Sequence, residues 1–381
     1  MSNRTTSPSA YAGQKPHYHI LDGLRGVAAL AVIGYHIFEA YDCRHINHGY
    51  LSVDFFFILS GFVIGYAYDD RWNGSLQNGG KGGRMTVRQF FKRRLIRLHP
   101  MVVMGALIGG AMFYTQGCEA WNVSCVSVGA LIGGVVLSAL MIPAPQSIEV
   151  RGIGEMFPIN GPTWSLFFEY LGNILYALVL RRLSTRRLAA VVGTAACALA
   201  AMSIAGPQGD LSVGWAMTPF NLGGGSLRLL FAFPAGLLMS RIFRPAKVRG
   251  AFWIGAAIIW AVAAMPRLGG TEHLWQNGIF DAACAILLFP AVVWIAASGR
   301  TTDAVTTRIC KFMGDISYPL YVVHYPFIYL YYAWVKNNGL SFGESIWGAA
   351  AVVAGSVVLA WLCLKLYDEP VRRWLARRFL Y

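Results

Sequence analysis

The sequence predicts an all-α polytopic membrane protein, with about ten transmembrane helices and one further helix that is re-entrant or lies in the outer leaflet. Hydrophobic residues make up 56% of the 381 residues and charged residues only 13%, which is too apolar for a soluble globular chain. Apolar segments that approach the length of a membrane-spanning helix recur along almost the whole chain. Short clusters of Lys and Arg separate these segments, as in the cytoplasmic loops of polytopic membrane proteins.

Eleven apolar segments are candidates for membrane spans. They cover residues 20–40, 51–68, 100–116, 127–143, 163–180, 188–205, 227–240, 250–266, 277–297, 315–335 and 344–365. The segment 127–143 is near the lower length limit for a helix that crosses a bilayer. If this segment does not cross, 27 of the 32 Lys and Arg residues fall on one side of the membrane with both termini. Because cytoplasmic loops carry the excess of basic residues, we predict ten crossings with both termini cytoplasmic.

The chain divides into one membrane domain and two polar ends. Residues 1–18 are polar and lack an apolar core, so we predict a disordered cytoplasmic tail rather than a cleavable signal peptide. Residues 19–366 form the predicted transmembrane domain, and residues 367–381 form a basic cytoplasmic C-terminal tail. Residues 117–162 are expected to roof a cleft on the outer face, since irregular backbone at membrane depth must line a protein cavity.

The cysteines predict no metal site. The seven cysteines are scattered without a CxxC pattern, which suits small buried hydrophobic residues better than metal ligands. The predicted topology places Cys43, Cys118 and Cys125 on the outer side, where an oxidising compartment permits disulfides. A Cys118–Cys125 bridge and two free thiols are both compatible with the sequence, because spacing alone does not determine connectivity.

The first apolar segment carries two ionisable residues, Arg25 and His36. At about 100° per residue their separation makes nearly three turns, so both side chains lie on one helix face, about 16 Å apart along the axis. An arginine inside a membrane helix has to face the bundle interior or water, so the pair indicates a functional site. The alternative is that Arg25 is an interfacial anchor and His36 is a packing residue.

Five motifs are spread over nearly the whole chain. In order they are LDGLRGVAAL (21–30) followed by His36, FFILSGF (56–62), RLIR (94–97), GPTWSL (161–166) followed by Glu169, and ISYPLY (316–321) followed by His324. In this combination and order the motifs resemble the acyltransferase-3 family of integral membrane proteins, although each motif alone has little specificity. The resemblance implies a membrane O-acyltransferase, which transfers acyl groups other than amino-acyl groups.

The resemblance also implies the substrates. The donor is acyl-CoA from the cytoplasm, with acetyl as the expected acyl group, and no cofactor is bound permanently. The acceptor is a hydroxyl of a surface carbohydrate, a glycolipid or a related molecule on the outer face of a bacterial cytoplasmic (inner) membrane. The net charge of +14 does not indicate a nucleic-acid partner, because the basic residues lie in short clusters between apolar runs and act as topology signals.

The resemblance makes Arg25 and His36 the expected catalytic pair, and we place Glu169 in the same site. His36 lies past the membrane midplane, where a neutral imidazole can take a proton from an acceptor hydroxyl. Glu169 is also expected in the outer half, where it needs a partner such as Arg25, His36 or a substrate hydroxyl. A structural ion pair is the alternative role for Glu169.

Arg94 and Arg97 are the expected donor-binding residues. The two side chains share one helix face, and guanidinium groups present paired donors that match phosphate oxygens. In the family the matching RxxR motif is implicated in handling the acyl-CoA donor. The alternative is that this basic cluster is only a topology signal.

Further candidates support the substrates or the catalytic residues. These are Asp54, Ser60, Trp164, Ser165 and His324. Asp54 either orients His36 or Arg25 or stabilises the start of its own helix. Ser60 and its neighbouring glycine allow helices to approach closely. His324 lies in an aromatic stretch that is either an interfacial belt or a surface on which sugars stack.

A transporter or permease is the alternative function. It would use Arg25, His36 and Glu169 as a relay for protons or substrate, which buried ionisable residues also permit. A purely structural membrane protein has no need of three ionisable residues inside apolar spans. Hydrolysis of acyl-CoA by the detergent-solubilised protein distinguishes an enzyme from a transporter.

The motifs leave the transfer mechanism open. Direct transfer of the acyl group and a covalent acyl-enzyme intermediate are both compatible with them.

Overall fold

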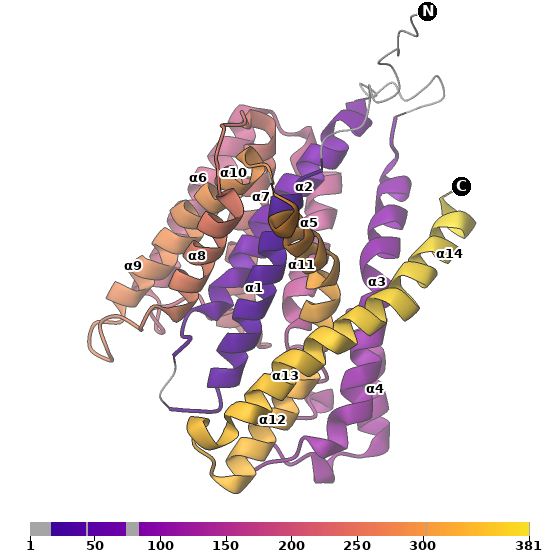
Figure 1. Cartoon of the computed structure of the whole chain (residues 1–381), viewed down its shortest axis with the longest axis vertical. Coiled ribbons are helices and arrows are strands. Elements are labelled where there is room, and N and C mark those ends of the chain that lie inside the picture. The colour runs from indigo at the N-terminus through magenta and orange to yellow at the C-terminus, as the bar shows by residue number, and fades with distance from the viewer. Residues whose placement is uncertain (1–16, 43–44, 74–83, 302, 381) are drawn as a thin grey trace, which may run out of the picture.

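The computed structural model describes residues 17–42, 45–73, 84–301 and 303–380, which form a bundle of helices (Figure 1). In chain order the helices are α1 (His19–Phe38), α2 (Ser52–Asn73), α3 (Val87–Met112), α4 (Val128–Ala139), α5 (Thr163–Leu178), α6 (Thr185–Ala205), α7 (Pro219–Ile242), α8 (Ala251–Ala264), α9 (Trp275–Ala283), α10 (Phe289–Ser298), α11 (Ala304–Val323), α12 (Tyr325–Asn338), α13 (Phe342–Cys363) and α14 (Glu369–Phe379). No β-strand occurs in these residues. Within the same ranges, eight helical segments are long and apolar enough to cross a membrane. The predicted all-α polytopic fold class is confirmed.

Two of the ten predicted crossings differ from a single long apolar helix. The segment 250–266 corresponds to α8, whose 14 residues span about 21 Å. The segment 315–335 covers the end of α11 and most of α12, which meet at His324. A crossing at this place therefore uses two helices with a break between them.

Helix α4 is too short to cross a bilayer. Its 12 residues span about 18 Å, against about 30 Å for the hydrocarbon core. It packs beside α3 (Figure 1). This length agrees with the expectation that the segment 127–143 does not cross.

The two ends of the bundle differ in charge. Helices α2, α5 and α7 end, and α3 begins, at the end that is uppermost in Figure 1. Arg71, Arg181, Arg182 and Arg241 lie in the last turns of helical segments there. We call this end the basic face and the other end, where α12 joins α13, the opposite face. The grouping of these arginines agrees with the predicted placement of the basic clusters on one side.

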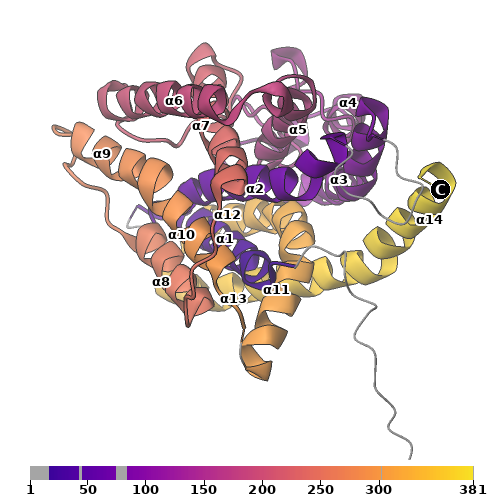
Figure 2. The ribbon, with the colours of Figure 1, turned by 90° about the horizontal axis from the view of Figure 1, so that it is seen from above.

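Small residues allow the central helices to approach closely. Helix α1 runs through the middle of the bundle (Figure 2), and 14 of its 20 residues are buried. A Cβ atom at Gly26 would lie 2.5 Å from the carbonyl oxygen of Met313 on α11. A Cβ atom at Gly61 of α2 would lie 2.0 Å from the carbonyl oxygen of Phe233 on α7. The close helix packing that the sequence predicts at Gly61 is confirmed.

The connection from α4 to α5 enters the bundle. Met156, Phe157 and Ile159 of this connection are fully buried, and the Asn160 side chain donates a hydrogen bond of 2.7 Å to the carbonyl of Val322. Helix α5 therefore begins inside the bundle rather than at the opposite face. Its 16 residues span only about 24 Å, which is shorter than the hydrocarbon core.

The C-terminal residues form a helix rather than a tail. Helix α13 continues through a π turn at Leu364–Asp368 into α14, which packs across α3. The Lys92 ammonium of α3 lies 5.9 Å from the ring centroid of Phe379 at the end of α14. The predicted boundary between residues 366 and 367 therefore falls inside one continuous helical segment.

Parts of the predicted N-terminal tail and of the outer cysteine group are not described. Residues 1–16 and Cys43 lie outside the described residues. The described end of the tail, Tyr18, already accepts a helical hydrogen bond at the start of α1. Cys118 and Cys125 are free thiols, so the open question of a bridge between them is answered by two unpaired residues.

Candidate functional site

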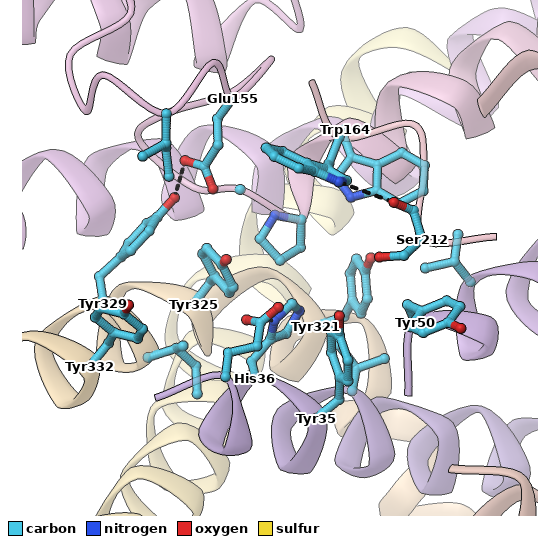
Figure 3. Close-up of a pocket in the computed structure, with 18 of the residues that line it drawn as sticks. Tyr35, His36, Tyr50, Glu155, Trp164, Ser212, Tyr321, Tyr325, Tyr329 and Tyr332 are labelled. Atoms are coloured by element: carbon cyan, nitrogen blue, oxygen red, sulfur yellow. Dashed lines mark hydrogen bonds and ion pairs between the residues drawn. The ribbon is translucent and has the colours of Figure 1, made fainter. Parts of the chain in front are cut away.

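Three adjacent cavities follow α1 from the opposite face to the basic face. The aromatic chamber, about 290 Å³, has in its wall Tyr35, His36, Tyr50, Glu155, Trp164, Ser212, Tyr321, Tyr325, Tyr329 and Tyr332 (Figure 3). The middle chamber, about 110 Å³, is lined among others by Arg25, Ser60, Arg94, Arg97, Ser165, Glu169, Tyr318 and Tyr321. The basic chamber, about 870 Å³, is lined among others by Asp22, Arg25, Arg93, Arg97, Lys311, Asp315, Asp368, Glu369, Arg372 and Arg373.

Neighbouring chambers share wall residues. Val53 and Tyr321 line both the aromatic and the middle chamber. Arg25, Arg97 and Tyr318 line both the middle and the basic chamber. Only the thickness of these side chains separates each cavity from the next, so the three chambers form one row through the bundle.

His36 lines the aromatic chamber with its ring held in one tautomer. Its Nδ1 atom lies 2.6 Å from Oε2 of Glu39, one turn further along α1. A carboxylate only accepts hydrogen bonds, so Nδ1 carries a proton, and in the neutral imidazole Nε2 then has a free lone pair. Nε2 has no hydrogen-bond partner among the described residues. The imidazole is therefore oriented to accept a proton, as a general base has to be.

His324 lies behind His36 at the break between α11 and α12. The two rings are stacked, with centroids 5.9 Å apart and an angle of 29° between their planes. His324 is fully buried, and its Nδ1 atom donates to the carbonyl oxygen of Tyr321 at 2.9 Å. The His324 ring itself is too buried to belong to an interfacial belt or to a sugar-stacking surface. Other rings of the same aromatic stretch, Tyr325 and Tyr332, line the aromatic chamber, so the prediction of a stacking surface stays open for them.

Glu169 lines the middle chamber and is hydrogen-bonded to side chains of α2 and α3. Its Oε1 atom accepts hydrogen bonds from Ser60 Oγ at 2.9 Å and from the Arg94 guanidinium at 3.0 Å. The expected partners Arg25 and His36 are not its partners. The expected position in the outer half is also wrong, because α5 starts inside the bundle and carries Glu169 toward the basic face. Ser60 has a polar contact in addition to any packing role.

Arg25 and His36 share a helix face but not a cavity. The Arg25 guanidinium donates to Ser317 Oγ at 2.7 Å and to the carbonyl of Gly314 at 3.2 Å, and it lies 3.2 Å from Asp22. It lines the middle and basic chambers, whereas His36 lines the aromatic chamber. Because the two residues are about 16 Å apart along α1, they lie beside different chambers of the row.

Asp54 forms a buried ion pair and does not orient His36 or Arg25. Both carboxylate oxygens accept hydrogen bonds from Arg228 of α7, at 3.1 Å and 2.7 Å. The topology prediction counted Arg228 among the five basic residues on the outer side of the membrane. Instead it lies on the third turn of α7, because the glycine-rich residues 223–226 are helical and let neighbouring side chains pack against them. The Arg228 guanidinium lies 5.3 Å from the ring of Trp164 in the aromatic chamber.

Ser165 holds Tyr321 at the boundary between the aromatic and middle chambers. The Ser165 hydroxyl donates to the carbonyl of Pro162 at 3.0 Å. The Tyr321 hydroxyl lies 2.7 Å from Ser165 Oγ and therefore acts as the donor in this second hydrogen bond. These two hydrogen bonds fix the position of the Tyr321 ring, which separates the aromatic chamber from the middle chamber.

The two arginines of the RxxR motif lie in different surroundings. Both line the middle chamber, which confirms that they share a helix face. Arg94 is paired with Glu169, and its Nε atom donates to Asn173 at 2.6 Å. Arg97 also lines the basic chamber and has no ion pair with any residue that the structure describes. Arg97 is therefore the member of the motif whose charge is available to a ligand.

Comparison with known families decides what kind of protein this is. A family model described as an acyltransferase domain matches residues 18–365, which is nearly the whole chain. The chain belongs to the acyltransferase-3 family. The matched region contains every element that lines the aromatic and middle chambers. Family membership identifies the protein as an integral membrane acyltransferase and favours this function over transport.

Relatives within the acyltransferase-3 family support O-acylation. The acyltransferase MdmB of Streptomyces mycarofaciens is 25% identical over 94% of this chain and 92% of its own length. The peptidoglycan O-acetyltransferase OatA of Listeria monocytogenes is 22% identical over 93% of this chain but only 55% of its own length. A protein named protein 2 in picA locus, from Rhizobium radiobacter, is 34% identical over 42% of this chain and 80% of its own length. No solved structure matches the chain.

Sequence reasoning missed a carboxyl group in the aromatic chamber of this acyltransferase-3 protein. Glu155 lies in the connection before α5 and accepts a short hydrogen bond from the hydroxyl of Tyr329 (Figure 3). Arg151 lies nearby with its guanidinium 3.3 Å from the Tyr329 ring centroid, and it donates to the carbonyl of Pro158. Burial raises the pKa of Glu155 to about 7. The only signal in the sequence was the presence of charged residues in a segment expected to roof a cleft.

Replacing Glu155 by glutamine is expected to stabilise the protein at pH 8 by up to about 3 kcal/mol. A raised pKa means that the folded protein binds this proton more tightly than the unfolded chain, so ionisation weakens the fold as pH rises from about 4.5 to about 7. Glutamine keeps an oxygen that accepts from Tyr329 and cannot ionise. Thermal unfolding of detergent-solubilised protein should show a gain at pH 8 that shrinks toward pH 5. Glu272→Gln, at an exposed carboxylate, is the control; a Glu155→Gln gain that is independent of pH would contradict the prediction.

Glu39 is a second functional residue that the motifs did not include. It is one turn beyond His36 on α1 and lines the same chamber. The spacing of three residues on a helix was a usable signal, because side chains at that spacing meet. Glu39 contacts His36 and fixes the orientation of its ring, so it is a candidate positioning residue.

Proposed function

We propose that this acyltransferase moves an acetyl group from cytoplasmic acetyl-CoA to a hydroxyl of a carbohydrate or glycolipid on the outer side of a bacterial cytoplasmic membrane. The observation that carries the proposal is the row of three chambers, with the His36 imidazole in one end chamber and arginine side chains in the other. In this orientation the basic face is cytoplasmic, as the excess of Lys and Arg favours. The printed name of the Listeria relative supports an acetyl group and a carbohydrate acceptor.

The donor enters from the basic chamber. Its nucleotide phosphates bind arginine side chains there, and Arg97 stands at the passage to the middle chamber. The flexible arm of the donor then extends along α1 through the middle chamber, over the distance of about 16 Å between Arg25 and His36. This arm brings the thioester to the boundary at Tyr321, within reach of the aromatic chamber.

The acceptor occupies the aromatic chamber. Rings such as Tyr325, Trp164 and Tyr332 offer flat faces on which a sugar packs, and the carboxylates of Glu39 and Glu155 accept hydrogen bonds from its hydroxyl groups. The neighbouring Arg228 is neutralised by Asp54, so it adds no free positive charge to the wall. These features favour an acceptor rich in hydroxyl groups.

His36 acts as the general base in a direct transfer. Nε2 takes the proton of the acceptor hydroxyl while its oxygen attacks the thioester carbonyl, and the tetrahedral intermediate expels the thiolate as the C–S bond breaks. The imidazolium then returns the proton to the thiolate, which gives the ester, the free thiol of CoA and neutral His36. Ser165 donates its hydroxyl proton to the carbonyl of Pro162 and so has no adjacent base. Ser60 donates to Glu169, but the same carboxylate oxygen is paired with Arg94, which makes it a weak base.

Two measurements test the proposed function. Protein in neutral-lipid nanodiscs should release free CoA thiol from acetyl-CoA slowly by itself, and faster when the acceptor is added. Mass spectrometry of surface polysaccharide and glycolipid should find acetyl esters in cells with the gene that are absent from cells without it. If acetyl-CoA is not consumed and the two sets of glycans are identical, the proposed function is wrong.

The orientation predicts the result of reporter fusions. A reporter joined after Arg182, at the end of α5, is expected to be active only as a cytoplasmic fusion, and one joined near Glu149 only as an external fusion. The reason is that α4 does not cross, so Glu149 stays on the outer side, and α5 then returns the chain to the cytoplasmic side before Arg182. Alkaline phosphatase and fluorescent-protein fusions at both positions give complementary readings. Opposite results would require α4 to cross or the whole bundle to be inverted.

A further inference from the structure

Helix α14 forms part of the wall of the basic chamber, although it lies outside the region that the acyltransferase domain matches. Glu369, Arg372, Arg373 and Ala376 all line the chamber, and their spacing places them on one face of α14. Arg378 does not line the chamber and is exposed, about 140° around the helix from Arg373. One face of α14 is therefore turned to the cavity.

Most of the acidic charge in this chamber is already paired. Asp22 pairs with Arg25 at 3.2 Å and Asp368 with Arg372 at 2.9 Å. Glu369 pairs with Lys365, one turn earlier. Among the described residues this leaves Asp315 as the wall carboxylate with no ion pair.

Several cations in the same wall have no acidic partner. Arg93, Arg97, Lys311 and Arg373 form no ion pair within the described ranges. The Nε atom of Arg93 is buried and has no hydrogen-bond partner there. Arg97 is repelled by the guanidinium groups around it, and the two carboxylates that attract it, Asp22 and Asp368, are already paired with other arginines. Four unpaired cations against one unpaired carboxylate, in a cavity of about 870 Å³, make a site for a large polyanion.

We propose that α14 completes the donor site, with Arg373 and Lys311 binding the phosphate groups of the CoA nucleotide across the chamber from Arg93 and Arg97. Guanidinium and ammonium groups bind phosphate oxygens through charge-assisted hydrogen bonds, and the buried Arg93 Nε atom gains the acceptor that it lacks. The inference rests on the proposed use of CoA and adds the C-terminal helix to the residues that recognise it.

Arg373→Gln and Arg378→Gln form a matched pair of variants, because they remove the same charge from opposite sides of one helix. Purified full-length protein in neutral-lipid nanodiscs is titrated with CoA and with dephospho-CoA, which lacks the 3′-phosphate. Arg373→Gln is expected to weaken CoA binding on the order of tenfold and to reduce the preference for CoA over dephospho-CoA. Arg378→Gln should bind both as the wild type does. Lys311→Gln, on α11, provides a second test if Arg373→Gln does not give monodisperse protein.

The possible outcomes separate this inference from the proposed function. If the wild type binds no CoA and consumes no acetyl-CoA, the proposed function is wrong. If the wild type binds CoA but Arg373→Gln, Lys311→Gln and Arg378→Gln bind it equally well, α14 is not part of the donor site and the proposed function stands. An anionic lipid headgroup is another source of phosphate. If phosphatidylglycerol in the nanodiscs displaces CoA from the wild type while CoA and dephospho-CoA bind equally, the chamber binds lipid and the inference is overturned.

Discussion

Replacing His36 by glutamine is expected to lower the rate of acyl transfer by roughly 10²–10⁴-fold while the protein still folds and binds its donor. Glutamine keeps a polar side chain beside Glu39 but has no nitrogen that accepts a proton at neutral pH. The donor site is unaffected, because its arginine side chains line the other chambers. The measurement is the initial rate of transfer from acetyl-CoA, divided by the amount of monodisperse protein, together with the Kd for CoA.

The control for this prediction is Glu39→Gln. It leaves the base in place but removes the carboxylate that fixes its tautomer, so the loss of rate should be smaller than for His36→Gln and should change with pH differently from the wild type. A His36→Gln enzyme with the specific activity of the wild type would remove this residue from the mechanism. The carboxyl groups of Glu39 and Glu155 would then be the remaining candidates for a base in the aromatic chamber.

Replacing Asp54 by asparagine is expected to destabilise the protein by about 3–5 kcal/mol, because it leaves the Arg228 charge buried without a partner. The side chains of Arg228 and Asp54 are 1% and 0% exposed, and the pair joins α7 to α2 through two hydrogen bonds. The measurement is the unfolding transition of purified protein in one detergent. Lys365→Gln is the control, since it breaks an exposed pair that contributes at most about 1 kcal/mol.

A second variant shows whether the charge itself is responsible. In Asp54→Leu with Arg228→Met both charges are absent, and such replacements of buried pairs are often neutral or stabilising. The double variant should therefore unfold at a higher temperature than Asp54→Asn. If Asp54→Asn unfolds like the wild type, water or another group solvates Arg228. The ion pair between Asp54 and Arg228 then does not hold α2 and α7 together.

The helices were predictable wherever a long apolar run has clear ends. Helix α1 was expected at 20–40 and occupies His19–Phe38. The start of α7 was missed because hydropathy is low over its first two turns, where glycine and asparagine lie inside the helix. Helices α11 and α12 were merged, because the apolar run continues through His324 and hydropathy does not register a change of direction.

The site was predictable one residue at a time but not in its pairings. The motifs pointed to His36, Glu169 and Arg97, and each of them lines one of the three chambers. The partners of these side chains come from helices far apart in the chain, as with Asp54 and Arg228, which are separated by 174 residues. Which charges meet depends on helix depth and rotation, and the buried connection before α5 changes that depth for Glu169.

The shared wall at Val53 and Tyr321 has an electrical consequence for a protein with chambers near both faces. In the proposed orientation the aromatic and basic chambers lie toward opposite faces, so the membrane voltage falls across the small middle chamber and the side chains around it. Moving one elementary charge through a full 100 mV takes about 2.3 kcal/mol. The acetyl thioester that approaches the wall is neutral, and the departing thiol regains its proton before it leaves. The transfer therefore moves no net charge through the field, and the bilayer stays insulated while an acyl group passes from one side to the other.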